Sequence, residues 1–124
     1  MATCVSTGNC WDIRAQREAR FRLIRLLVDQ GVQLVSGSDA GVAYNAFTDY
    51  PGDLILTVEG TDLSPLYVLK STTSVAAEAL GREDLGVIAP GKAADLLAVQ
   101  GNPLQDIRVL NHPKLVVARG RIIQ

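Results

Sequence analysis

Residues 13–41 have the sequence IRAQREARFRLIRLLVDQGVQLVSGSDAG. A long amphipathic stretch comes first and is followed by Gly31, a short apolar run and a loop of small residues. Apolar side chains at helical spacing predict a helix from about Ile13 to Gln30. Asp12 can cap its start, and Gly31 can end it in the left-handed conformation. The following run, Val32–Ser36, is too short for anything but a buried strand. A helix joined to a strand by one glycine is typical of an αβ unit in a parallel sheet.

Arginine is concentrated on this predicted helix, which raises the question of a nucleic-acid partner. The chain carries 12 Lys and Arg against 13 Asp and Glu, and this balance argues against electrostatic binding of nucleic acid. A helix that buries one apolar face and leaves its arginines in water explains the pattern without a ligand. The apolar face contains Phe21, Ile24, Leu27 and Val28, and the arginines are Arg14, Arg17, Arg20, Arg22 and Arg25.

The composition is that of a globular protein of average domain size. The chain has 124 residues, of which 48% are apolar, enough for a hydrophobic core. It contains no run of about 18 apolar residues, so no membrane span is expected, and no basic-then-apolar leader follows Met1. We therefore expect a cytoplasmic protein in which Cys4 and Cys10 are reduced thiols. Their C-x₅-C spacing matches no common zinc or redox motif.

Shorter helices are predicted between the small-residue loop and Gly81. Residues 42–50 have no clear period and are expected to form a long loop. Pro51 can occupy the first turn of a helix over Gly52–Glu59. A second helix is expected to begin at Ser64-Pro65, and a third to open at Thr73 or Ser74 and to close at Gly81.

The pattern after Gly81 is that of β-structure. Short apolar runs at 86–89 and 95–99 flank Pro90-Gly91, which is typical of a type II turn or a hairpin. Lys92 is expected to reach solvent near Asp95. Residues 115–118 and 121–123, separated by Gly120, predict a terminal hairpin. The chain is thus divided into an irregular lead-in (1–11), a helical segment with one parallel-type strand (12–81) and a small β unit (82–124), and its expected fold class is α/β plus β.

Two segments carry a resemblance to a known family. They are Val35–Gly41 (VSGSDAG) and Leu85–Leu96 (LGVIAPGKAADL). The sequence resembles the metal-dependent amidohydrolase superfamily, in particular its imidazolonepropionase-like and prolidase-like branch. The resemblance implies that the first segment ends the last strand of a (β/α) barrel. The second then marks where the chain leaves the barrel for a small β-sandwich, and the resemblance extends over nearly everything from Arg17 to the end.

The resemblance gives Asp39 a chemical role. It implies that this aspartate binds Zn²⁺ or another divalent metal and takes the proton of the attacking water. Taken by itself, an aspartate in a glycine-rich loop is more simply one that accepts backbone N–H bonds. The family's other ligands, a His-x-His pair, a Lys or Glu and two further histidines, have no counterpart because His112 is the only histidine. One carboxylate does not make a zinc site, so we expect no metal to be bound by this chain alone.

Two functions follow from the resemblance. The chain is either the C-terminal portion of a hydrolase of amide, cyclic amide or related C–N bonds, or a catalytically silent remnant that acts as a self-associating binding or assembly module. A complete barrel needs about 250 residues, so we expect a fragment, a relic reading frame or a stand-alone remnant.

An assembly expectation also follows from the resemblance. It implies that the strand Val32–Ser36 pairs with the first and seventh barrel strands, which this chain lacks. We therefore expect both edges of this strand to be open and the apolar face of the first helix to need cover. Two copies that pair strands, or that swap the C-terminal hairpin, about a two-fold axis would form an obligate dimer and bury well above ~2,000 Å².

Overall fold

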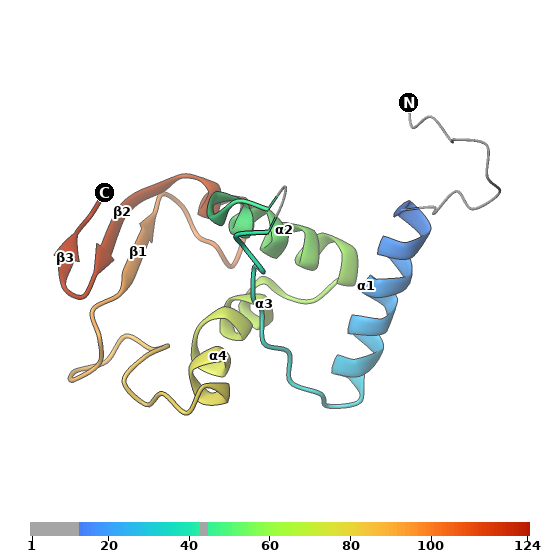
Figure 1. The fold of residues 1–124 in the computed structure, drawn as a ribbon, viewed down its shortest axis with the longest axis horizontal. Helices are drawn as coiled ribbons and strands as arrows, with labels where there is room; N and C mark the ends of the chain where they lie inside the picture. The colour runs from blue at the N-terminus through green and yellow to red at the C-terminus, as the bar shows by residue number, and fades with distance from the viewer. Residues whose placement is uncertain (1–12, 43–44) are drawn as a thin grey trace.

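The computed structural model describes residues 13–42 and 45–124. Figure 1 shows a long first helix at one end of the molecule, a small sheet at the other, and three shorter helices between them. The elements are α1 (Ile13–Asp29), η1 (Phe47–Asp49), α2 (Tyr50–Thr61), α3 (Pro65–Thr72), α4 (Ser74–Ala79), β1 (Leu96–Val99), η2 (Ile107–Asn111), β2 (Pro113–Ala118) and β3 (Arg121–Ile122). Within the described ranges, no helix has both the length and the apolar content needed to cross a bilayer.

The four α-helices lie close to where the sequence predicts them. After α1 the chain turns at Gly31, whose φ is 83°, in agreement with its expected role as a helix stop. Pro51 occupies the first turn of α2. At the start of α3, the Ser64 hydroxyl accepts a hydrogen bond from the Tyr67 amide at 3.2 Å. The predicted cap of α1, Asp12, lies outside the described residues.

The prediction of a buried parallel strand at Val32–Ser36 is wrong. The segment is extended, but it pairs with no strand in the part of the chain that the structure describes. Its partners are helical: the Leu34 amide donates to the Tyr67 hydroxyl at 3.3 Å, and the Ser36 amide donates to the Ser71 carbonyl at 3.0 Å. Along one edge of the segment, Tyr67 and Ser71 of α3 therefore supply hydrogen bonds that a neighbouring strand would otherwise supply.

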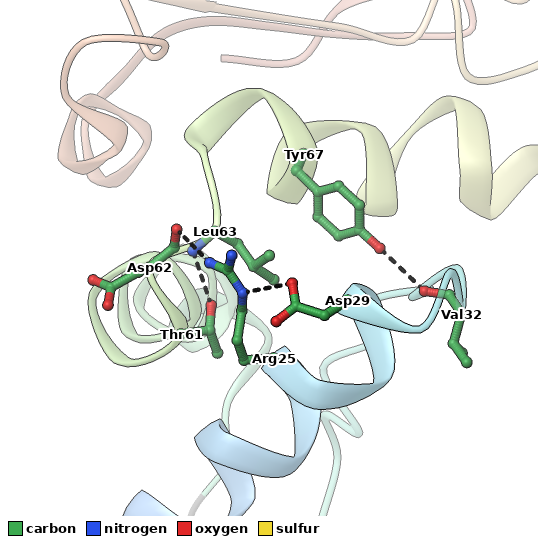
Figure 2. Close-up of polar contacts among 7 residues, drawn as sticks. All are labelled: Arg25, Asp29, Val32, Thr61, Asp62, Leu63 and Tyr67. Carbon is green, nitrogen blue, oxygen red and sulfur yellow. Dashed lines mark hydrogen bonds and ion pairs between the residues drawn. The ribbon is translucent and has the colours of Figure 1, made fainter.

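Two tyrosine hydroxyls satisfy carbonyls of the same segment. Tyr67 Oη donates to the Val32 carbonyl at 3.4 Å (Figure 2), and Tyr50 Oη donates to the Ser36 carbonyl at 3.2 Å. All these contacts use even-numbered residues of the segment, whose backbone groups point to one side of an extended chain. The expectation of two open edges is thus also wrong, because one edge is occupied.

The hydrophobic core joins the helices to the C-terminal part of the chain. Its buried apolar residues come from α2, the α2–α3 connection, α3 and η2, namely Leu54, Leu63, Val68, Ile107 and Leu110. No pattern in the sequence predicted η2. A spacing of three places Ile107 and Leu110 on the same side of a 3₁₀-helix, and both side chains are buried. Residues on both sides of Gly81 thus share one core.

Helix α1 contributes to this core with only part of its apolar face. Ile24 and Val28 pack against the core residues. Leu23 and Leu26, in contrast, are more than half exposed, and Leu27 is 37% exposed. The apolar face was expected to need cover. The structure covers the part that contains Ile24 and Val28, and it leaves the part that contains Leu23 and Leu26 exposed to solvent.

One arginine joins α1 to the C-terminal end of α2. Arg25 pairs with Asp29 at 2.9 Å and donates to the Asp62 carbonyl at 3.3 Å (Figure 2). Asp62 ends α2 in the left-handed conformation, with φ 55°. A cation here satisfies a carbonyl at the negative end of the helix dipole. The buried Thr61 hydroxyl accepts from the Leu63 amide at 3.3 Å and so holds the turn into the core.

The second segment of the resemblance forms a loop that leads into β1. The sequence predicted a type II turn or a hairpin at Pro90-Gly91, and because residues 86–89 are not a strand, the hairpin is not formed. The turn itself is present, because the Lys92 amide donates to the Ala89 carbonyl at 3.2 Å and Gly91 has a φ of 82°, as the third position of a type II turn requires. Lys92 was expected to reach solvent near Asp95, but its Nζ donates to the Glu83 carbonyl.

The predicted terminal hairpin is confirmed as β2 and β3. Arg119 and Gly120 connect these strands with φ values of 51° and 76°, the left-handed pair of a type I′ turn. The Asp95 carboxylate accepts from the Arg119 amide at 2.6 Å and so anchors this turn to the start of β1. The sheet is antiparallel in the order β1-β2-β3, with a bulge between Ala98 and Val99.

Candidate functional site

Asp39 lies in the loop that follows the extended segment, and its side chain is exposed. Its φ of 51° places it in the left-handed region, which few non-glycine residues adopt but which aspartate tolerates better than most. Such backbone conformations persist where the surroundings hold them, and they are common at functional sites. Asp39 is therefore the first residue to consider for chemistry.

The hydrogen bonds that shape the loop use residues on either side of Asp39. The Ala40 amide donates to the Ser38 hydroxyl at 3.2 Å. From further along the chain, Asn45 Nδ2 donates to the Ser38 carbonyl at 2.5 Å, and the Gly41 amide donates to the Asn45 carbonyl at 3.1 Å. These contacts fix the backbone of Asp39 without using its side chain.

The Asp39 carboxylate has no hydrogen-bond donor and no cation within the described ranges. The simpler interpretation, in which it accepts backbone N–H bonds of its own loop, finds no such contact there. A carboxylate that faces solvent with both oxygens available can bind a cation or accept a proton or hydrogen bond from a substrate. The geometry is compatible with the ligand role that the resemblance implies.

The described residues do not fit a complete metal site. They contain no group of three or more His, Cys, Asp or Glu side chains that could hold an ion, whereas zinc needs three or four protein ligands. His112 is exposed at the end of η2, where its amide donates to the Val109 carbonyl at 3.2 Å. Cys4 and Cys10 lie outside the described residues. Asp39 thus accounts for one ligand at most.

Sequence reasoning missed the residues that position this loop. Tyr67, Tyr50 and Ser71 hold the extended segment that leads into it, and Asn45 ties down the loop itself. Tyr50 and Tyr67 also pack against the core, so each combines a buried ring with a hydroxyl at a backbone group. No spacing rule connects tyrosines in two separate helices with an extended segment that precedes both.

Comparison with known proteins identifies the family. The model of the family described as "Amidohydrolase family" matches residues 5–123. The chain belongs to the amidohydrolase family. It is 33% identical over 75 residues to an imidazolonepropionase from Rhodococcus jostii, a match that covers 60% of this chain and 18% of that protein. It is 32% identical over 102 residues to an ochratoxinase from Aspergillus niger, which covers 75% of this chain and 21% of that protein.

A solved amidohydrolase-type structure also matches the fold. A Xaa-Pro dipeptidase with methionine bound in its active site superposes with a TM-score of 0.76 and 32% identity, over 91% of this chain and 27% of that chain. The chain thus spans about a fifth of the length of the curated relatives and about a quarter of this solved structure. An amidohydrolase of the relatives' size has most of its residues outside the region matched here.

Proposed function

We propose that this chain is the C-terminal portion of a metal-dependent hydrolase of amide, cyclic amide or related C–N bonds. One observation carries the proposal: in a chain of this family, Asp39 presents a free carboxylate from a loop whose backbone is fixed by Ser38 and Asn45. The dipeptidase among the similar structures supports an amide bond as the target.

Asp39 would act in two ways in such an enzyme. Its carboxylate would be one ligand of the divalent metal, with the remaining ligands supplied by residues beyond the described ranges. It would also accept the proton of the water that attacks the carbonyl carbon. Zn²⁺ or a similar ion would supply Lewis-acid chemistry when bound. The exposure of Asp39 suits both roles, as does the lack of an ion pair to its carboxylate among the described residues.

The test combines this chain with the residues that it lacks. The corresponding C-terminal quarter of the Xaa-Pro dipeptidase would be replaced by this chain, and hydrolysis of a Xaa-Pro dipeptide would be measured with zinc present. We expect turnover that falls about a hundredfold or more in Asp39→Asn. The matched control is Asp49→Asn, which removes a carboxylate whose hydrogen bond among the described residues is with the Ala46 amide.

Two results would contradict the proposal. One is a folded, zinc-loaded chimera whose turnover is the same in Asp39→Asn and Asp49→Asn. The other is turnover by the isolated chain, which we expect to remain at background because the described residues hold at most one ligand. Thermal melting of both variants checks that each is folded.

The alternative is a catalytically silent module that self-associates, and the incomplete ligand set among the described residues is compatible with both functions. Metal analysis of the purified chain separates the two functions in part. Tight, stoichiometric zinc in the isolated chain would contradict a silent module, whereas zinc well below one ion per chain is expected under either function.

A further inference from the structure

One residue, Asn45, holds the backbone on both sides of Asp39. Its Nδ2 donates to the Ser38 carbonyl at 2.5 Å, and its carbonyl accepts from the Gly41 amide at 3.1 Å. In the described part of the chain, these are the hydrogen bonds that reach residues 38–41 from outside residues 38–42. Asp39 and Ala40 lie between the two bonded positions, so both ends of this short stretch are fixed to the same residue.

Asp39 has a backbone conformation that its surroundings must maintain. Its φ of 51° lies in the left-handed region, which is unfavourable for residues other than glycine. Such a conformation persists where the surrounding structure over-determines it. The two bonds from Asn45, which bracket Asp39 at Ser38 and Gly41, supply a restraint of this kind.

Asn45 also connects the Asp39 loop to a helix of the hydrophobic core. The 3₁₀-helix η1 begins two residues after Asn45 and runs directly into α2, whose Leu54 is 5% exposed and belongs to the core. The bond from the Ala40 amide to the Ser38 hydroxyl is local to the loop and cannot place the loop relative to the rest of the fold. The bonds from Asn45 can, because core packing holds the helix that follows it.

The burial of these side chains separates the group that holds the loop from the group that the loop presents. Ser38 and Asn45 are half-buried, whereas Asp39 is exposed. A partly buried hydrogen bond competes less with water than one at the surface. All these contacts lie within residues 38–45, so they do not depend on an exposed strand edge.

We propose that Asn45 is a positioning residue for Asp39: its amide holds the Ser38 carbonyl so that the Asp39 carboxylate lies where it binds the metal and takes up the proton. This inference rests on the proposed hydrolase function. Reacting groups must be held to within about 0.5 Å, and a misplacement of about 1 Å can lower a rate about a hundredfold. Asparagine suits the position because its amide donates to a carbonyl without adding a charge beside Asp39.

The test substitutes Asn45 in the chimera with the Xaa-Pro dipeptidase. We expect kcat to fall about tenfold or more in Asn45→Ala and in Asn45→Asp, with KM within a few-fold, because both variants lack the amide donor. Asn45→Gln keeps the donor on a longer side chain and should retain more activity than Asn45→Ala. The matched control is Asn102→Ala, which removes a loop asparagine whose side chain accepts from the Leu104 amide at 3.0 Å. It should stay within a few-fold of the parent chimera.

A double-mutant cycle separates positioning of Asp39 from a general structural role. In the Asp39→Asn background, Asn45→Ala should change turnover by no more than about twofold, because the group through which Asn45 acts is already lost. A purely structural role would instead lower turnover by the same factor in both backgrounds. Thermal melting checks that each variant is folded.

NMR of the chain without its fusion partner tests the same restraint without activity. The coupling between the amide proton and Hα of Asp39 reports its φ, and we expect Asp39 to leave the left-handed region in Asn45→Ala but not in Asn102→Ala. A left-handed Asp39 in folded Asn45→Ala would overturn the inference.

The results that contradict this inference differ from those that contradict the proposed function. Equal turnover in Asp39→Asn and Asp49→Asn overturns the proposed function, and this inference with it. If Asp39→Asn loses turnover but folded Asn45→Ala and Asn45→Asp match Asn102→Ala, only the positioning role is overturned. An equal effect of Asn45→Ala in both backgrounds of the cycle likewise overturns that role alone.

Discussion

The ring of Phe21 on α1 lies against Gly60 on α2, in the space that a Cβ at position 60 would occupy. Glycine inside a helix normally destabilises it by about 1 kcal/mol relative to alanine. Here it lets the two helices approach, and Ile24 and Val28 on the same face of α1 can then reach the core. The residue that weakens α2 locally is the one that lets α1 pack.

Substitution of Gly60 by alanine should therefore destabilise the protein in spite of the gain in helix propensity. Overlap with the Phe21 ring costs about 1–3 kcal/mol, and the propensity gain offsets about 1 kcal/mol of this. Gly52→Ala in the same helix is the matched control, because a Cβ there meets nothing within 4 Å, and it should be neutral or stabilising. Urea unfolding of the two variants measures the difference.

Shortening the Phe21 side chain should remove that penalty. In the Phe21→Ala background, Gly60→Ala should no longer destabilise. A penalty at Gly60 that persists without the ring would show that the overlap is not its cause.

Gly86 should tolerate substitution far less than Gly91, although both have a φ of 82°. A Cβ at Gly86 would lie 2.7 Å from the Thr73 carbonyl oxygen and 2.8 Å from the Ala77 Cβ, whereas at Gly91 it meets nothing within 4 Å. We expect Gly91→Ala or Gly91→Val to cost about 1–2 kcal/mol from backbone strain alone. Gly86→Ala should cost about 3 kcal/mol or more because overlap adds to strain. Equal urea midpoints for Gly86→Ala and Gly91→Ala would contradict this packing.

Removal of the Tyr67 hydroxyl should loosen the segment before Asp39. In Tyr67→Phe the Leu34 amide loses its acceptor and the Val32 carbonyl loses a donor. We expect a loss of about 1–2 kcal/mol, the usual cost of leaving a partly buried polar group unpaired. Faster amide exchange at Leu34 provides a local readout. Tyr50→Phe, which removes one donor to the Ser36 carbonyl, should cost less.

The Arg82–Asp84 pair predicts a pH effect at the acid end of the scale. Hydrogen bonds from the Arg82 side chain hold the pKa of Asp84 at about 2, below its ordinary value of 3.8. Since the folded-state pKa is lowered, the pair contributes stability above pH ~4 that is lost as the pH falls toward 2. NMR titration of the Asp84 carboxyl carbon should show a midpoint near 2 that moves up in Arg82→Gln. An unchanged midpoint in that variant would rule out Arg82 as the cause.

The left-handed backbone conformation of Asp39 should lower the free energy of unfolding of the chain. Because its φ is 51°, Asp39→Gly should leave the free energy of unfolding unchanged or raise it by up to about 1 kcal/mol. Asp39→Val should lower it by about 1–2 kcal/mol, since a β-branched residue is strained there. Thermal unfolding measures both, and a clear loss of stability in Asp39→Gly would show that the side chain has a structural role.

The sequence by itself determined the features that depend on neighbouring residues. Helical periodicity placed α1, proline and serine placed the starts of α2 and α3, and the spacing around Gly120 placed the terminal hairpin. Glycines at helix ends and in turns were predictable because a positive φ is a local requirement. The two segments around Asp39 and Pro90-Gly91 carried the family resemblance, since they are contiguous motifs.

Only the tertiary structure decided how the extended segment before Asp39 is held and where the core lies. The apolar run Val32–Ser36 has the composition of a strand, but a strand exists only where another strand supplies its hydrogen bonds. Here Tyr67 and Ser71 supply them along one edge, from more than thirty residues away in the sequence. Such pairings depend on how α2 packs against α1 and α3, and no local pattern encodes that packing. The ligands of a metal site come together from distant parts of a sequence in the same way. A contiguous motif could therefore single out Asp39 as a candidate ligand, but it could not identify further ligands.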